Sequence, residues 1–259
     1  MAADTRQAGE PLRDLASRVE KVDWYHTIEL APGLVTPGLF DHRPYVDHYR
    51  LPEDLSGQRV LDVGAQDGFW SFELERRGAT VTALDVDHPE ELDWPPRLRP
   101  GGVKREEGGF PLAMDTGFRL AHLALGSTVK REVTSIYDAT PEALGGTFDL
   151  VFAGSVLIHL RDPMLALERM AALCSGRLVI AEEYSRRLDW LPRLRAVEFR
   201  GESPWMTWWI PSSRAWESMV RCAGFEEVRR ESRFTLRFAA QKGGVPHAVV
   251  HARGVAPAR

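Results

Sequence analysis

Short apolar runs alternate along this chain with segments in which apolar residues recur every three or four positions. The runs predict strands buried on both faces, and the recurring spacing predicts amphipathic helices. Strands are expected at residues 60–63, 79–84, 130–136, 148–153, 177–181, 225–237 and 246–253. Helices are expected at residues 11–22, 69–77, 116–125, 141–144, 163–173 and 212–223. Five strands that alternate with helices, followed by a hairpin, predict an α/β fold.

The first of these strands leads into a glycine turn. Gly64 and Gly68 follow the apolar run and precede the helix that starts at Phe69. A glycine has no Cβ, so such a turn lets the backbone approach a ligand closely. The next strand ends on Asp85, about 20 residues past the turn, where a carboxylate can bond ribose hydroxyls. This layout predicts a nucleotide-binding unit.

The chemistry of the turn separates the candidate nucleotides. Its sequence, Gly-Ala-Gln-Asp-Gly, lacks the G-x-G-x-x-G spacing that places a pyrophosphate on a helix N-terminus. It carries Asp62 and Asp67, and no Lys or Arg stands between Val60 and Glu75. An acidic turn is a poor phosphate cradle and suits a cationic or zwitterionic ligand. NAD or FAD, or a turn that binds no nucleotide, are the alternatives.

The segment Val60-Leu61-Asp62-Val63-Gly64, together with Gly68 and Asp85, resembles motif I of the class I S-adenosylmethionine (SAM) methyltransferases. Ala65-Gln66 replaces the usual second glycine or cysteine of that motif. The resemblance implies SAM as the cofactor and a Rossmann-like, mostly parallel seven-stranded sheet with an antiparallel last strand. Ligands of such sheets bind beyond the carboxyl ends of the strands. The expected cofactor-binding residues are Asp62, Gly64, Ala65, Gln66, Gly68, Asp85, Val86, Asp87, Tyr137, Asp138, Gly154 and Ser155.

Three further motifs extend the match: Trp24-Tyr25-His26, Val156-Leu157-Ile158-His159 with Asp162-Pro163, and Ile210-Pro211-Ser212. Together they resemble the tRNA wobble-uridine (carboxy)methyltransferases and their uncharacterised bacterial relatives. Those enzymes hold the extra carboxylate of carboxy-SAM with basic residues, a tyrosine and an arginine, and the matching positions here are His26, Ile158 and Trp205. An isoleucine and a tryptophan cannot clamp a carboxylate. We therefore expect plain SAM and methyl transfer, not carboxymethyl transfer.

Composition narrows the class of partner. The 259 residues carry a net charge of −4, are 44% hydrophobic and 27% charged, and have a pI near 6.1, so no global charge favours nucleic acid or an anionic membrane. No apolar run reaches 18 residues and the first nine residues do not resemble a signal peptide, which predicts a cytoplasmic protein without a membrane partner. One basic cluster consists of Arg186, Arg187, Arg193 and Arg195. We interpret it as a solvent-exposed loop face, and a nucleic-acid-binding patch is the alternative.

We expect two parts in the chain: an N-terminal cap segment, residues 1–50, and a domain, residues 51–259, that the resemblance identifies as a SAM-binding methyltransferase domain. Residues 24–45 are aromatic, rich in histidine and broken by Pro-Gly turns, so they do not fit a parallel sheet. Cys174 and Cys222 lie far apart in helical contexts and are expected to be buried thiols, neither a disulfide nor a metal pair. No metal site is expected, and a homodimer is left open.

Candidate catalytic residues follow from the chemistry of methyl transfer. Transfer from SAM is an in-line displacement that depends on positioning, and a hydroxyl or amine nucleophile also needs a base. His159 lies just past the fourth strand of the sheet and is the first candidate base, with a structural role as the alternative. His26 is the second candidate, provided that the cap segment folds over the site. Glu182 is the third candidate: it and Glu183 end the fifth strand, and one of the two is expected to face the acceptor and the other solvent.

Aromatic residues mark the expected acceptor pocket. Tyr25 and Phe40 of the cap segment, with Trp205, Trp208 and Trp209 near the C-terminal helix, are the candidates, and core packing is the alternative. Such a wall suits a flat or apolar small-molecule acceptor. Rival interpretations are a tRNA uridine modifier, a non-catalytic SAM-binding or partner-binding domain, and a nicotinamide oxidoreductase.

Overall fold

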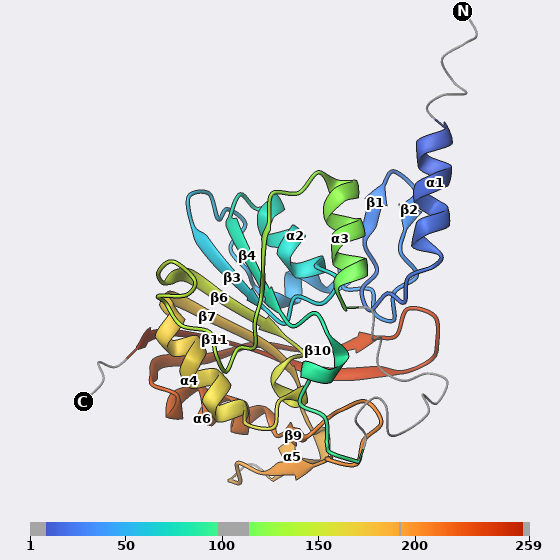
Figure 1. Ribbon diagram of the computed structural model, residues 1–259. Coiled ribbons are helices and arrows are strands. Elements are labelled where there is room, and N and C mark those ends of the chain that lie inside the picture. The colour runs from blue at the N-terminus through green and yellow to red at the C-terminus, as the bar shows by residue number, and fades with distance from the viewer. Residues whose placement is uncertain (1–8, 98–113, 192, 256–259) are drawn as a thin grey trace, which may run out of the picture.

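A computed structural model describes residues 9–97, 114–191 and 193–255. At its centre is a seven-stranded sheet with the order β10-β11-β7-β6-β3-β4-β5 (Figure 1). These strands are β3 (Arg59–Val63), β4 (Thr80–Asp85), β5 (Lys130–Val133), β6 (Phe148–Gly154), β7 (Cys174–Glu183), β10 (Phe225–Arg237) and β11 (Gly244–Val255). β11 is antiparallel to both neighbours and the remaining pairs are parallel. The expected Rossmann-like fold with its antiparallel last strand is confirmed.

Helices cover both faces of the sheet (Figure 1). α2 (Phe69–Arg76) and α3 (Met114–Leu125) pack on one face, and α4 (Pro163–Leu173) and α6 (Ser213–Cys222) pack on the other. Strands β3 and β6 are buried on both sides, which explains their continuous apolar sequences. α4 and α6 begin at Asp162 and Ser212, whose side chains accept hydrogen bonds from Leu165 and Ala215 N–H.

The cap segment folds against the sheet through short elements. It contains α1 (Gly9–Val19), a hairpin of β1 (Glu29–Ala31) and β2 (Leu34–Val35), and a 3₁₀ helix, η1 (Arg43–Tyr49). Phe40 forms isolated bridges with His26 and with Phe238, which follows β10. α1 ends three residues before the expected boundary at 22, and the Trp24 indole N–H donates to the Val19 carbonyl at that end.

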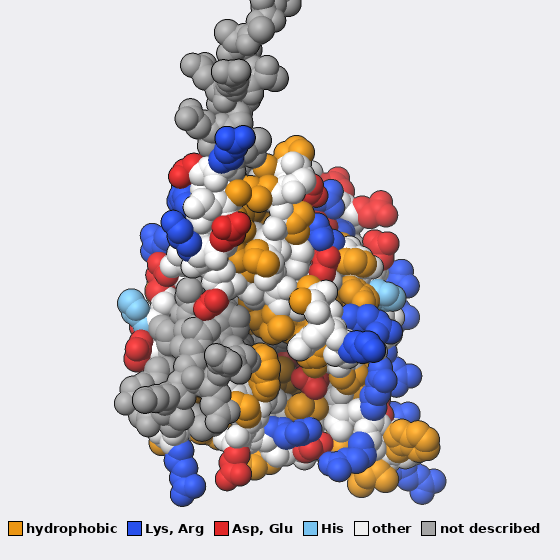
Figure 2. All heavy atoms as spheres, turned by 90° about the vertical axis from the view of Figure 1, so that its right-hand side faces the viewer, with side chains coloured by type: hydrophobic (Ala, Val, Ile, Leu, Met, Phe, Trp, Pro, Cys, Tyr) orange, Lys and Arg blue, Asp and Glu red, His pale blue; other side chains and the backbone are white. Residues whose placement is uncertain are grey.

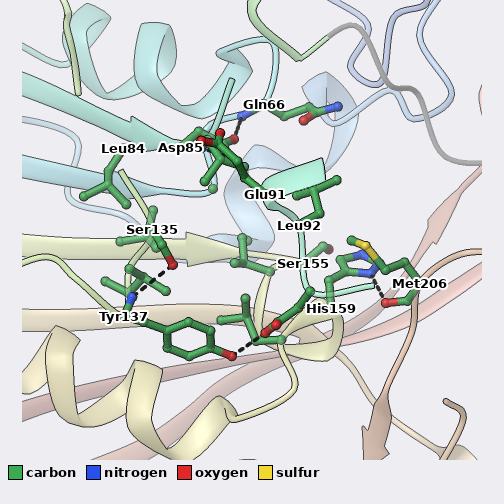
Figure 3. A pocket seen from close by; sticks show the side chains of 18 of the residues that line it. Gln66, Leu84, Asp85, Glu91, Leu92, Ser135, Tyr137, Ser155, His159 and Met206 are labelled. Atoms are coloured by element: carbon green, nitrogen blue, oxygen red, sulfur yellow. Dashed lines mark hydrogen bonds between the residues drawn. The ribbon is translucent and has the colours of Figure 1, made fainter. Parts of the chain in front are cut away.

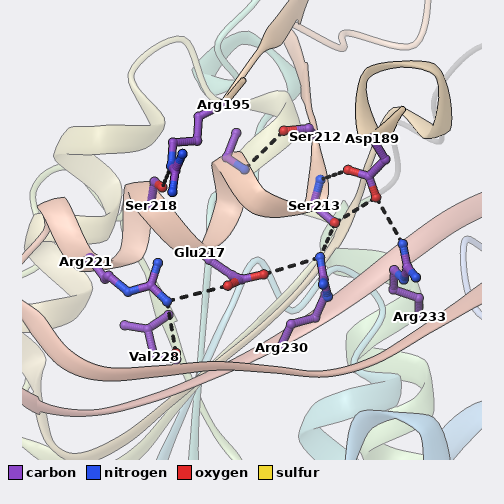
Figure 4. Close-up of polar contacts among 11 residues, drawn as sticks. Asp189, Arg195, Ser212, Ser213, Glu217, Ser218, Arg221, Val228, Arg230 and Arg233 are labelled. Carbon is purple, nitrogen blue, oxygen red and sulfur yellow. Dashed lines mark hydrogen bonds and ion pairs between the residues drawn. The ribbon is translucent and has the colours of Figure 1, made fainter. Parts of the chain in front are cut away.

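The segment between β7 and α6 contains three short elements, none of which is among the elements expected from the sequence. These are α5 (Arg186–Asp189) and an antiparallel pair, β8 (Val197–Phe199) and β9 (Trp209–Pro211). Asp189 accepts hydrogen bonds from the backbone and hydroxyl of Ser213, both at 2.8 Å, and pairs with Arg233 (Figure 4). Glu217 of α6 pairs with Arg230 of β10 at 3.3 Å. This network ties the segment to α6 and to the final hairpin.

Three expected boundaries were wrong. The strand expected at 130–136 ends at Val133, and the helix expected at 141–144 is a turn. β7 starts at Cys174, directly after α4, whereas the apolar pattern indicated 177 because Ser175 and Gly176 are exposed at the start of the strand. No helix among the described residues is long and apolar enough to cross a membrane.

Candidate functional site

The glycine turn between β3 and α2 has the backbone geometry of a close-approach loop. Gly64 and Gly68 adopt φ of 72° and 93°, and Gln66 between them adopts φ of 52°. A Cβ on Gly64 would lie 2.3 Å from a methyl group of Val156, so no larger residue fits there. Asp85 at the end of β4 accepts a 2.7 Å hydrogen bond from the Gln66 N–H. Asp85 therefore fixes the turn and also lines the pocket beside it.

A pocket lies beyond the carboxyl ends of β3, β4 and β6 and encloses about 870 Å³, part of it open to solvent. Gln66 and Asp85 line one side, and His159 and Met206 line another (Figure 3). Tyr137 donates a 2.6 Å hydrogen bond to Asp93, which also lines the pocket.

The structure brings seven of the expected cofactor residues to this pocket, which are Gly64, Gln66, Asp85, Val86, Tyr137, Gly154 and Ser155. Five others do not line it, which are Asp62, Ala65, Gly68, Asp87 and Asp138. Asp62 points into the interior and accepts a 2.6 Å hydrogen bond from Ser71 of α2, and burial raises the pKa of its carboxyl to about 7. Asp87 pairs with Arg131 at 2.8 Å.

A second pocket adjoins the first. It encloses about 830 Å³, and its wall shares Tyr25, Ser155 and His159 with the first pocket. Of the expected acceptor residues, Tyr25, Phe40 and Trp205 line it. Trp208 and Trp209 do not, because their indole N–H groups donate to the carbonyls of Asp93 and Arg161 in the surrounding backbone.

His159 stands on the wall between the two pockets. Its Nδ1 lies 3.2 Å from the Met206 carbonyl, so Nδ1 carries the proton and Nε2 is the nitrogen with the lone pair. Burial lowers the pKa of the imidazole to about 4, which keeps the ring neutral near pH 7. Met206 adopts φ of 56°, which orients its carbonyl toward the ring.

His26 and Tyr25 are held to the glycine turn by Asp67. One Asp67 oxygen accepts the backbone N–H groups of Tyr25 and His26 at 2.8 and 2.9 Å, and the other contacts His26 Nδ1. The cap segment therefore does fold over the site, and His26 lines the first pocket. A single buried carboxylate joins the cap segment to the turn, although the sequence reasoning treated Asp67 only as a charge.

Glu182 and Glu183 point to opposite faces of the sheet, because adjacent residues of a strand alternate. Glu182 is fully buried and lines neither pocket; its Oε1 accepts the N–H groups of Val156 and Leu157, both at 3.0 Å. Burial raises the pKa of the Glu182 carboxyl to about 8. The structure therefore places Glu182 as a support for the His159 turn, whereas its neighbour Glu183 lines the second pocket.

Sequence reasoning missed several residues of the site. His247 of β11 lies on the wall of the second pocket, with Nε2 2.8 Å from the Ser155 hydroxyl. Ser155 adopts φ of 57°, which a serine rarely does, and this conformation directs its side chain to His247. A histidine among the alternating apolar residues of this strand was the one feature of the sequence that could have indicated its role. Within the described ranges, no group of three or more His, Cys, Asp or Glu side chains is arranged to hold a metal ion.

Comparison with known proteins yields consistent matches. A family model described as "Methyltransferase domain" matches residues 44–230. A tRNA U34 carboxymethyltransferase from Ectopseudomonas mendocina is 29% identical over 182 residues, 68% of this chain and 47% of that protein. A ubiquinone biosynthesis O-methyltransferase from Xanthomonas euvesicatoria is 32% identical over 130 residues, 49% of this chain and 44% of that protein. The chain thus spans less than half the length of either relative.

Among solved structures, the N-terminal domain of EvdMO1 with S-adenosylhomocysteine (SAH) bound superposes with a TM-score of 0.64. The match covers 93% of this chain and 96% of that one at 18% identity. At this identity the similarity concerns the fold.

Proposed function

The chain belongs to the class I SAM-dependent methyltransferase family, and we propose that it transfers the methyl group of SAM to a small organic acceptor. The observation that carries the proposal is the wall of Tyr25, Ser155 and His159 between two pockets. A cofactor in the first pocket and an acceptor in the second would meet at that wall. Methyl transfer needs this kind of juxtaposition, because a displacement reaction gains most from holding the reacting atoms in line.

The proposed cofactor site is the turn from Gly64 to Gly68 with Asp85 as the acid for the ribose hydroxyls. His159 is the proposed group next to the nucleophile and the first candidate base for an acceptor hydroxyl or amine. An imidazole with a pKa near 4 is a weak base, so most of the rate enhancement would come from the positioning of the two reactants. His26, held by Asp67, is the second candidate base.

Two measurements test this function. Calorimetry with SAH should show binding that Gly64→Val abolishes, because a side chain there meets Val156. A panel of small phenols, amines and carbon acids should then yield SAH from SAM in the presence of at least one acceptor class. Tight SAH binding without turnover on any acceptor would favour the non-catalytic alternative. Stabilisation by NAD(P)H and not by SAH would favour the oxidoreductase.

A tRNA acceptor is the second candidate, supported by the similarity to the tRNA U34 carboxymethyltransferase and by Trp190, which is 86% exposed beside the arginine cluster. Against it, Arg187 pairs with Glu198 and Arg195 bonds Ser218. On the face drawn in Figure 2, Lys and Arg side chains gather toward one edge, while hydrophobic side chains occupy the middle. A tRNA acceptor predicts retention that weakens steeply with salt. Elution of tRNA at low salt with no modified uridine would exclude it.

A further inference from the structure

Glu183, the last residue of β7, is a half-buried carboxyl on the wall of the second pocket. Within the described part of the chain, its side chain makes no hydrogen bond and no ion pair. Its backbone carbonyl accepts the Trp216 indole N–H at 2.9 Å, which fixes the end of the strand. The backbone of Glu183 is therefore held in place, and among the described residues its carboxyl, which lines the pocket, has no hydrogen-bond or ion-pair partner.

The other ionisable groups of this wall are neutral or already paired. Arg200 bonds Glu198 at 2.8 Å and is itself half exposed. Burial lowers the pKa of both His159 and His247 to about 4, so both rings are neutral near pH 7. Among the described residues of the wall, Glu183 is thus the one charge without a direct counter-charge.

Burial raises the pKa of the Glu183 carboxyl to about 7, because its ionised form is poorly hydrated. A desolvated carboxylate without a donor is costly, and a cationic hydrogen-bond donor on a ligand would remove that cost. Aromatic side chains also line this pocket, among them Phe40, Trp205 and Phe238. Aromatic faces also attract cations and flat apolar groups.

We propose that the acceptor is a flat, apolar amine whose ammonium group binds Glu183 while its body packs against the aromatic wall. This inference rests on the proposed function and names the substrate class of its second pocket. Glu183 lines the second pocket and not the first. With the ammonium bound at Glu183, another group of the acceptor would lie at the shared wall of Tyr25, Ser155 and His159.

Three probes of one shape and different charge test the proposal: tyramine, para-ethylphenol and para-hydroxyphenylacetate. Binding to the SAH complex is measured by calorimetry and by saturation-transfer NMR. Tyramine should bind about tenfold more tightly than para-hydroxyphenylacetate, since a charge-assisted hydrogen bond is gained in one case and like charges meet in the other. Para-ethylphenol should fall between them. Equal or tighter binding of the anion, or no binding of any probe, would overturn the proposal.

Substitutions distinguish the contribution of Glu183 to the binding preference from that of neighbouring groups. Glu183→Gln should reduce the preference for tyramine to within about twofold, and Arg200→Gln should enlarge it. Glu226→Gln, an exposed acid of β10 away from both pockets, is the matched control and should leave the preference intact. An unchanged preference in Glu183→Gln contradicts the assignment. Failure of the proposed function is distinguished by the absence of SAH binding in the parent protein.

The tyramine preference should also depend on pH. The charged and titratable groups around Glu183 are Arg200 and Glu198 from the β8 segment, His247 from β11, Arg186 from α5, and Tyr25 from the cap segment. Tyramine and the anion keep their charges between about pH 6 and pH 8. The preference should therefore rise through about pH 7 as Glu183 ionises, and Glu183→Gln should flatten the profile. A flat profile in the parent would overturn the proposal.

Discussion

At the scale of single residues, burial decides which groups of the site carry charge. Burial raises the pKa of Asp62 to about 7 and of Glu182 to about 8, and it lowers the pKa of His247 to about 4. Burial also raises the pKa of Asp85, and the hydrogen bonds that it accepts from the Gln66 and Val86 N–H groups act in the opposite direction. These two bonds fix the carboxyl at the end of β4, next to the proposed ribose site.

The Asp85 carboxylate should account for a measurable part of the cofactor affinity. We expect Asp85→Asn to weaken SAH binding by about tenfold or more, because a hydrogen bond from a ribose hydroxyl to a charged acceptor is lost. Asp87→Asn is the matched control, since Asp87 lies two residues further on and pairs with Arg131 outside the pocket. Calorimetry with SAH measures both, and equal losses would contradict the assignment.

Glu182 should make the protein less stable as pH rises. Burial raises its pKa to about 8 in the folded protein from an ordinary value of 4.5, so the folded state holds one more proton between those values. The free energy of unfolding therefore falls with rising pH across that window. Glu182→Gln mimics the protonated acid and should match the parent near pH 5. It should exceed the parent by up to about 4 kcal/mol near pH 9, a bound set by the size of the pKa shift.

Urea denaturation of parent and variant at the two pH values measures this difference. Glu226→Gln, an exposed acid, serves as the control and should shift the stability equally at both pH values. A Glu182→Gln variant that is less stable than the parent at high pH would show that the ionised carboxylate is needed by the Val156 and Leu157 N–H groups.

At the scale of elements, the cap segment depends on the turn that follows β3. Asp67 accepts two backbone N–H groups and one imidazole nitrogen of the cap segment. These bonds set the position of Tyr25, which lines both pockets. Asp67 is therefore a positioning residue for the proposed acceptor site.

Loss of Asp67 should release the cap segment while the sheet stays folded. In Asp67→Ala we expect hydrogen exchange of the Tyr25 and His26 amides to accelerate by about tenfold or more, since buried charge-assisted bonds are lost. Exchange in β6 should not change. Asp54→Ala is a suitable control, because Asp54 also accepts a backbone N–H, from Ser56, at an exposed site. Unchanged exchange at Tyr25 would show that other contacts hold the segment.

The elements with strong periodicity were predictable, whereas much of the site was not. Strands such as β3 and β6 are buried on both faces, so their sequences are recognisable apolar runs. Gly64 directly indicates the turn that follows β3. β8 and β9 have only three residues each and form by pairing with one another. Their short sequences therefore contain no apolar pattern from which the strands could be predicted. His247 and Asp93 reach the pockets through tertiary packing, and no spacing along the chain encodes that approach.

At the scale of the whole molecule, the cap segment and the final hairpin, which are far apart in the sequence, meet at the second pocket. Tyr25 and Phe40 come from the cap segment, and Phe238 and His247 come from the final hairpin. The shared wall with the cofactor pocket carries no cation, since Tyr25 and Ser155 are uncharged and the His159 ring is neutral near pH 7. A negatively charged group on the transferred carbon would have no partner there.

Plain SAM should therefore be preferred over carboxy-SAM. We expect SAM to bind at least about tenfold more tightly, because the extra carboxylate would be desolvated beside Ile158 and Trp205, while Arg200 of the same pocket already pairs with Glu198. Competition calorimetry against SAH measures the ratio. An Ile158→Tyr and Trp205→Arg double variant should narrow it, and equal binding of the two cofactors by the parent would contradict the expectation.

The two pockets share only part of their walls, and this affects how such an enzyme can change its acceptor. Leu39, Trp205 and Phe238 line the second pocket alone, so substitutions there leave the walls of the first pocket untouched. Tyr25, Ser155 and His159 are common to both and are the positions under double constraint. An altered acceptor can thus arise by changes in the cap segment, the β8–β9 region and the final hairpin. Selection or directed evolution for a new substrate would draw its mutations from those segments.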